Sequence, residues 1–209
     1  MERYLLDQME SGVPITIVRP SLTFGPGARN VGVLRQNAGI LFRIRHGKPL
    51  VIFGDGTGLW SFSFTADVAR GIVGLLGEAP AVGNHFHIVG EEPTVWADLY
   101  REFGRIVGRE PVLEHVPAAL LYEADPDRFG HIYFEKRYPG LFSSAKLRTI
   151  LPDFRPVYSL ASGLRELVSS WESDGLTPDP ELDRYEDRIV AASRETRRTF
   201  LSALFDESS

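Results

Sequence analysis

The sequence contains no cysteine, which excludes disulfide bonds, thiolate nucleophiles and cysteine-based zinc or iron–sulfur sites. This absence favours a reducing compartment, and we expect the protein to be cytoplasmic. No stretch approaches the roughly 20 uninterrupted apolar residues of a membrane span. The N-terminus has neither the basic nor the apolar region of a secretory signal. An excess of basic residues is also lacking, because the net charge is -5, and this argues against nucleic acid as the main partner.

The chain has 209 residues, of which 43% are hydrophobic and 24% charged. This is the composition of an ordinary globular protein that can bury a core. The chain begins with an amphipathic segment, 2–11, and Gly12 follows where a left-handed residue ends helices. The next stretch, "VPITIVRP", is nearly all apolar and predicts a strand covered on both faces, as in a parallel sheet. Pro20 fits only at the end of that strand. Helix, loop and buried strand together predict half of a βαβ unit.

Later segments alternate between helical and strand patterns. The sequence predicts strands in "PLVIFGDGTGLWSFSF", around an Asp-Gly turn, and in "NHFHIV" and "PVLEHVP", with a loop-rich stretch at 125–142. Helices are expected at 31–47, after Thr65, after Thr94, and at 117–124, 144–151, 159–173 and from Pro180 onward. Only one or two strands suit a large parallel sheet, and a doubly wound sheet needs more. We therefore expect an incomplete α/β domain.

Four stretches in order carry a resemblance to a known family: "VPITIVRPSLTFGPG", "GKPLVIFGDGTGLWSFSFTADVARGIVGLL", "GNHFHIVGEEPTVWADLYREFGRIVG" and "FSSAKLRTILPDFRPVYSLASGLRELVSSW". Over roughly residues 1–173, the sequence resembles the C-terminal portion of extended short-chain dehydrogenase/reductases, the NAD-dependent epimerase/dehydratase family. The resemblance implies part of an NAD(P)-binding Rossmann-type fold with the smaller substrate-binding subdomain. It divides the chain into a remnant of the dinucleotide-binding domain (1–30), a substrate-binding region (31–173) and a helical extension (174–209).

In this family the N-terminal half carries a Gly-rich phosphate loop and a catalytic Tyr-x-x-x-Lys pair. Neither is present here, since Arg137 follows Tyr133 at the lysine spacing and Gln8 follows Tyr4. The stretch "GIVGLLG" has a similar glycine spacing but lies inside a helical pattern, whereas a phosphate loop joins a strand to a helix. The resemblance thus implies no catalytic residue in this chain, and a start a few residues past the family's lysine. It implies NAD or NADP in the complete parent, with an inactive chain by itself.

The resemblance also implies candidate cofactor-binding residues. Arg19, Pro20 and Ser21 would end the first strand beside the nicotinamide, with backbone groups near Pro20 lining its pocket. The alternative is structural: Arg19 is a strand-end charge and Pro20 a terminator.

Candidate substrate-binding residues are Thr23, Phe24 and Trp60. Thr23 and Phe24 would face the substrate cleft, because ligands lie outside the carboxyl ends of parallel strands. Trp60 stands where nucleotide-sugar members of the family commonly have an arginine that binds the diphosphate. Tryptophan supplies no charge to phosphate; it stacks on a sugar or base, or fills the core, and core packing is the favoured interpretation.

Other polar residues receive structural interpretations. Arg35, Arg43 or Arg45 could replace the missing arginine, although solvated helix charges are the simpler explanation. Asp67 is expected to cap or orient its helix. His85 and His87 share one strand face and are expected to pack. The acidic residues of 181–187 are interpreted as a solvated helix face.

The leading hypothesis is the substrate-binding part of an oxidoreductase that transfers hydride at a hydroxyl of a sugar or sugar-like small molecule, in a parent that could be a homodimer. Neither a metal ion nor a membrane is expected. Two alternatives stay open: a non-catalytic binding module, in a branch with relatives linked to RNA, and a truncated fragment without a stable fold.

Overall fold

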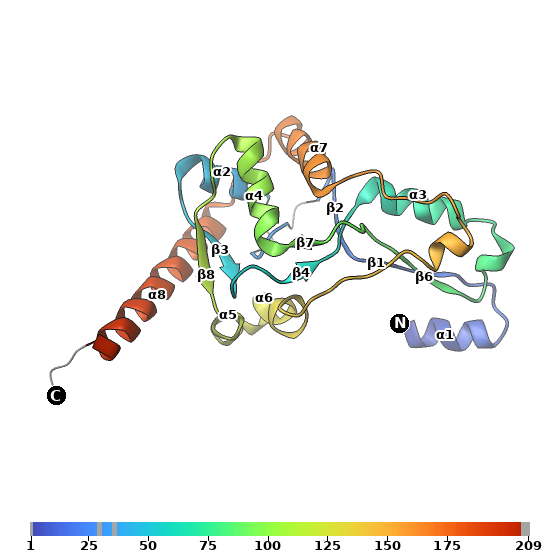
Figure 1. Ribbon diagram of the computed structural model, residues 1–209, viewed down its shortest axis with the longest axis horizontal. Helices are drawn as coiled ribbons and strands as arrows, with labels where there is room; N and C mark the ends of the chain where they lie inside the picture. Colours follow the sequence, from blue (N-terminus) through green and yellow to red (C-terminus); the bar gives the residue numbers. More distant parts are fainter. Residues whose placement is uncertain (1, 29–30, 35–36, 206–209) are drawn as a thin grey trace. The chain divides into compact units, whose positions relative to one another are not determined.

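The computed structural model describes residues 2–28, 31–34 and 37–205. The chain forms two compact units, and each collects three separate stretches of sequence. Unit 1 comprises Met1–Pro26, Trp60–Thr94 and Gly140–Leu167, and unit 2 comprises Gly27–Leu59, Val95–Pro139 and Val168–Ser209. Figure 1 labels most of the helices and strands.

Unit 1 contains two parallel strand pairs, β1 with β6 and β2 with β5. Its elements are α1 (Glu2–Glu10), β1 (Ile17–Pro20), β2 (Leu22–Phe24), β5 (Phe62–Phe64), α3 (Thr65–Leu75), η1 (Ala79–Ala81), β6 (His85–Ile88) and η3 (Leu147–Thr149). Apolar side chains from α3, η1, β6 and the 147–154 segment form one core cluster in this unit: Val68, Leu75, Ala81, Phe86, Ile88, Leu147 and Phe154. Gly71 lies so close to β6 that a Cβ there would stand 2.7 Å from the Ile88 side chain. The small residues of "GIVGLLG" therefore allow close helix–strand packing.

Unit 2 is built around the parallel pair of β3 and β8, which runs from Leu50↔Leu113 to Phe53↔Val116. Its elements are α2 (Gly39–His46), β3 (Leu50–Phe53), α4 (Trp96–Val107), β8 (Leu113–Val116), α5 (Ala118–Ala124), α6 (Pro126–His131), the π-helical turn η2 (Ile132–Lys136) and α8 (Pro180–Phe205). All four residues of β3 are buried, and α8 contacts both strands. Three further elements contain residues of both units: β4 (Leu59–Trp60), β7 (Thr94–Val95) and α7 (Leu160–Ser173). Strand β4 pairs with β7.

The predicted α/β class with parallel strands is confirmed, as are the helix that Gly108 ends in a left-handed conformation and the long C-terminal helix. The helix expected at 31–47 begins only at Gly39. Near the start of the predicted range, the Val33 amide donates to the hydroxyl of Tyr100 at 2.9 Å.

Several local predictions were wrong. The stretch 125–142 is not loop-rich, because Asp125 caps α6 through the Arg128 amide at 3.0 Å and η2 follows directly. The helix expected at 144–151 is only the short turn η3. Thr94 belongs to β7 and does not cap α4, which starts after Val95.

Candidate functional site

The candidate cofactor-binding residues lie where β1 ends, in unit 1. Strand β1 pairs in parallel with β6, so that Arg19 stands opposite His87 and Pro20 opposite Ile88. Pro20 is exposed and occupies the last position of the strand, as its missing amide hydrogen requires. Ser21 joins β1 to β2 and is half-buried.

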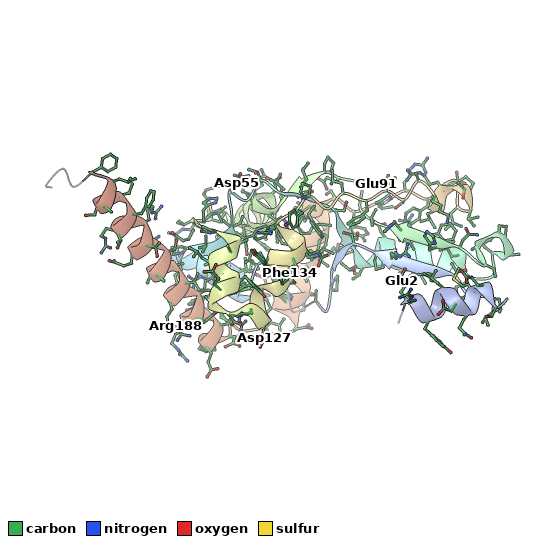
Figure 2. The ribbon with its side chains drawn as sticks, turned by 90° about the horizontal axis from the view of Figure 1, so that it is seen from below. Glu2, Asp55, Glu91, Asp127, Phe134 and Arg188 are labelled. Atoms are coloured by element: carbon green, nitrogen blue, oxygen red, sulfur yellow. The ribbon has the colours of Figure 1, made fainter. Side chains whose placement is uncertain are left out.

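Arg19 is held by an ion pair with α1. Its Nε donates to Glu2 Oε1 at 2.9 Å, and its second guanidinium nitrogen contacts the same oxygen. This bond lowers the pKa of the Glu2 carboxyl below its ordinary value. Both side chains are partly exposed, so the pair orients Arg19 more than it stabilises the fold. Figure 2 labels Glu2 on α1.

The hydroxyls of Ser21 and Thr23 both donate hydrogen bonds to backbone carbonyls near the strand ends. Ser21 Oγ donates to the carbonyl of Ser61 at 2.6 Å and ties the β1–β2 connection to the start of β5. Thr23 Oγ1 donates to the Ser21 carbonyl at 3.0 Å, and the side chain is exposed. Of the three candidate substrate residues, Thr23 alone is open to solvent.

Phe24 and Trp60 lie in the core. Phe24 is 2% exposed and packs edge-on against Phe62 and Phe64, with centroids 6.4 and 5.6 Å away. Trp60 is 3% exposed, and its ring so closely covers Gly140 that a Cβ there would approach it to 2.2 Å. In this unit neither side chain faces an open cleft, which accords with the core interpretation of Trp60 and differs from the orientation expected for Phe24.

Asp67 does not cap α3, contrary to one part of the prediction, since no side-chain bond caps that helix. Its buried carboxylate instead accepts the amides of Val157 and Tyr158, each at 3.0 Å, and pairs with Arg70 at 2.7 Å. The Tyr158 ring then stacks on Phe64 at 4.1 Å. Asp67 thus fixes the segment before α7 beside β5.

Three arginines were considered as replacements for the family arginine that is missing where Trp60 stands, and the structure gives a different outcome for each. Arg35 lies outside the described residues. Arg43 is not a solvated charge: it is 1% exposed and pairs with Asp183, Glu186 and Asp187 of α8. Arg45 is exposed and pairs with Glu172 at 3.1 Å.

The acidic residues of 181–187 are accordingly more than a solvated face. Glu186 is buried and accepts the Val51 amide at 2.7 Å, while Asp183 and Asp187 also bind Lys48. Partial burial opposes the charge of Lys48, but the bonds to the two aspartates raise its pKa above the ordinary value.

Of the two strand histidines, His87 makes the expected packing contacts, whereas the same expectation is wrong for His85, which is exposed. His87 stacks on Phe142 at 5.2 Å, and its Nδ1 lies 3.3 Å from the Arg19 carbonyl. No group of three or more His, Asp or Glu within the described part of the chain is arranged to hold a metal ion.

His85 is exposed, and the positive charge of Lys146 lowers its pKa below the ordinary value. We expect Lys146→Met to raise the His85 pKa, because the neighbouring cation that disfavours the imidazolium is removed. The pH dependence of the His85 ring proton in NMR spectra measures this. Added salt should raise the pKa of the unmodified protein in the same direction by screening, whereas an equal pKa in both proteins would contradict the assigned cause.

The candidate cofactor-binding residues supply the end of a parallel strand. The end of β1 offers exposed backbone at Pro20, but a strand–turn–helix with glycines, which binds phosphates, does not occur among the described residues. None of the helices described here combines the length and apolar character that crossing a bilayer demands.

Parallel strands followed by packed helices give the chain a mixed α/β fold with parallel strands, of the Rossmann type found in its structural neighbours. Residues 1–89 match the NAD dependent epimerase/dehydratase family, and the resemblance to that family is confirmed.

Particular relatives agree with this class. The chain is 32% identical over 102 residues to a Bacillus subtilis protein named "Uncharacterized UDP-glucose epimerase YtcB", covering 49% of this chain and 31% of that protein. Its fold is similar to epimerase Mth375 of Methanothermobacter thermautotrophicus, with a TM-score of 0.67, 20% identity, and coverage of 88% of this chain and 49% of the other. A UDP-glucuronic acid 4-epimerase of Bacillus cereus, in complex with UDP-glucuronic acid and NAD, gives a TM-score of 0.61 at 22% identity, covering 82% and 50%. The chain thus spans about half the length of these solved structures and about a third of the curated relative.

Proposed function

We propose that this chain is the C-terminal, substrate-side part of an NAD(P)-dependent epimerase/dehydratase-like oxidoreductase. The match of residues 1–89 to the family carries the proposal, and the half-length coverage of NAD-containing neighbours supports it. In the complete protein, NAD(P) would accept and return hydride at a hydroxyl-bearing carbon of the substrate. The names of the Bacillus relatives favour a sugar nucleotide as that substrate.

The chain's own contribution to the cofactor would be one wall of the nicotinamide pocket. Arg19, Pro20 and Ser21 end a parallel strand, and ligands of α/β sheets lie at such carboxyl ends. The Glu2 ion pair would orient Arg19, and the Ser61 carbonyl would fix the Ser21 hydroxyl. Thr23 would be the residue that contacts the substrate, because it is the exposed one of the three candidates. Phe24 and Trp60 would support the strand ends from the core.

Unit 1 also has an unpaired strand edge and an exposed apolar face, which a dinucleotide-binding half could cover. Within the described residues β1 pairs only with β6, so its second edge has no strand partner. Ile72 and Val73 on α3, and Leu76 just after it, are exposed, and a groove of about 380 Å³ lies between α3 and β1. An unpaired parallel edge beside an apolar face is a surface that proteins normally cover. We propose that a dinucleotide-binding half covers both.

A chimera tests the proposal. The part of YtcB that precedes its match to this chain is fused ahead of residues 1–209, and NAD retention and UDP-glucose epimerisation are measured. We expect both in the chimera and neither in the 209-residue chain, because the chain lacks the phosphate loop and the tyrosine base. The YtcB part alone is the control for NAD binding.

Two results would contradict the proposal. Nicotinamide-dependent turnover by the 209-residue chain would show that it is not a dependent half. A chimera that folds cooperatively and retains NAD, yet neither binds nor converts any UDP-sugar, would refute the substrate-side assignment.

A further inference from the structure

The second edge of β3 is covered by side chains instead of a strand. Within the described residues β3 pairs only with β8, so the backbone groups on its other side need different partners. The Val51 amide donates to Glu186 Oε1 of α8 at 2.7 Å, and the Val51 carbonyl accepts the Tyr100 hydroxyl at 3.4 Å. The carbonyl of Pro49, just before the strand, accepts Arg43 Nε at 2.9 Å and Nη2 at 2.6 Å. The edge is therefore closed, and at the Val51 amide it is α8 that closes it.

Helix α8 is attached to the rest of unit 2 by charge far more than by apolar burial. It contacts both β3 and β8 (Figure 1). Of its 26 residues, all of which the structure describes, only Glu186 and Val190 are buried. Its carboxylates at 183, 186 and 187 bind Arg43, those at 183 and 187 also bind Lys48, and its arginines at 194 and 197 bind Glu114.

Most of these ion pairs are open to solvent on the α8 side. The side chains of Asp187, Arg194 and Arg197 are 45%, 48% and 63% exposed. Attraction between exposed charges is weak and is screened by salt. The attachment of α8 should therefore weaken as the ionic strength rises.

The pairing of β3 with β8 has a different basis. The Leu50 amide donates to the Val112 carbonyl and the Gly54 amide to the Val116 carbonyl, each at 2.8 Å. All four residues of β3 are buried apolar residues, and salt screens buried interactions much less than exposed ones. Regions of one structure that differ in their stabilising contacts open separately.

We propose that α8 is an ionic latch on the second edge of β3: it detaches as a unit while β3 and β8 stay paired, and raised ionic strength favours the detached state. The buried pair of Arg43 with Glu186 does not prevent this, because detachment returns both charges to water and recovers their desolvation cost. Detachment takes Glu186 from the Val51 amide and uncovers an unpaired strand edge. Because such an edge readily pairs with other chains, the attached helix also protects unit 2 from association.

Native-state amide hydrogen exchange on the 209-residue chain, followed by NMR, tests the latch. The Val51 amide should exchange when α8 detaches, and the Leu50 and Gly54 amides only when the strand pair opens. We expect Val51 to be less protected than the other two. Its protection should fall roughly tenfold between about 0.01 M and about 1 M NaCl, over which the Debye length falls from about 30 Å to about 3 Å, while theirs changes little. Equal protection of the three amides, or protection of Val51 that is independent of salt, would overturn the proposal.

Two substitutions separate ion pairs across the α8 contact from charge in general. Lys48→Met removes the cation between two α8 aspartates, so it should lower the protection of Val51 at low salt roughly fivefold and weaken its salt dependence. Arg198→Met is the matched control, because Arg198 pairs with Glu195 within α8 itself, and it should leave Val51 unchanged. Equal loss of protection at Val51 and at the two strand-pair amides in Lys48→Met would show that α8 and the strands open together, and would refute the latch. The salt titration of the unmodified chain depends on neither variant, and no part of this test depends on the proposed enzymatic function.

Discussion

Arg43→Met should destabilise unit 2 by about 3–5 kcal/mol, the cost of leaving a buried charge without its partner. Arg43 Nε lies 3.1 Å from Glu186 Oε2, and both side chains are almost completely buried. The guanidinium also binds Asp183 at 2.6 Å and Asp187 at 2.9 Å, so that removing it leaves three α8 carboxylates near one lysine. Methionine keeps most of the packing volume. Urea denaturation gives the change in the free energy of unfolding.

Two further variants separate charge from packing. Arg45→Ala, two residues along the same helix, removes an exposed pair with Glu172 and should cost less than about 1 kcal/mol. Adding Glu186→Gln to Arg43→Met should recover most of the loss, because glutamine removes the buried charge and keeps an acceptor for the Val51 amide. Equal losses of unfolding free energy for Arg43→Met and Arg45→Ala would show that the buried ion pairs stabilise the protein no more than an exposed pair does.

Sequence reasoning could not find this network, because its members are far apart in the chain. Arg43 and Asp183 are separated by 140 positions. On the sequence each belongs to a charged stretch of an amphipathic helix, where exposure is the ordinary outcome. The contact of Arg19 with Glu2 was missed for the same reason. No local pattern marks which charges the fold will bury.

Elements with strong local signals were predicted well. The α4 and α8 helices have apolar periodicity together with end signals, Gly108 for one and Pro180 for the other. Helix α6 was missed although Asp125-Pro126 is a good capping residue followed by proline at the first helical position. The cap was the usable signal for this helix.

For the candidate site, the sequence predicts the position of the strand end but not the orientation of the side chains around it. The strand end at Pro20 follows from proline's missing donor, and the structure has it there. Whether Phe24 and Trp60 point to solvent depends on what packs against them. That is decided by Phe62, Phe64 and Gly140 in distant stretches, which composition and periodicity do not locate.

Trp171→Ala should cost about 3–5 kcal/mol, the usual range for truncating a fully buried aromatic side chain. Trp171 stacks on Phe103 at 5.7 Å with an interplanar angle of 13°, which joins α7 to α4. Its Nε1 also donates to the Ala28 carbonyl at 2.7 Å. Ala28 follows the Gly-Pro-Gly turn after β2, so this bond fixes the backbone that leaves the candidate substrate residues. Urea denaturation measures the loss of stability.

Trp171→Phe divides the effect into its two parts. Phenylalanine keeps the stack on Phe103 but cannot donate to Ala28, so we expect a smaller loss of about 1–2 kcal/mol. Amide exchange near Ala28 should nevertheless rise in Trp171→Phe, because the segment loses its attachment while the core persists. Equal stability of the two variants would mean that the loss comes from the hydrogen bond to Ala28 and not from the stack on Phe103. Unchanged exchange near Ala28 in Trp171→Phe would mean that the turn after β2 is ordered by other contacts.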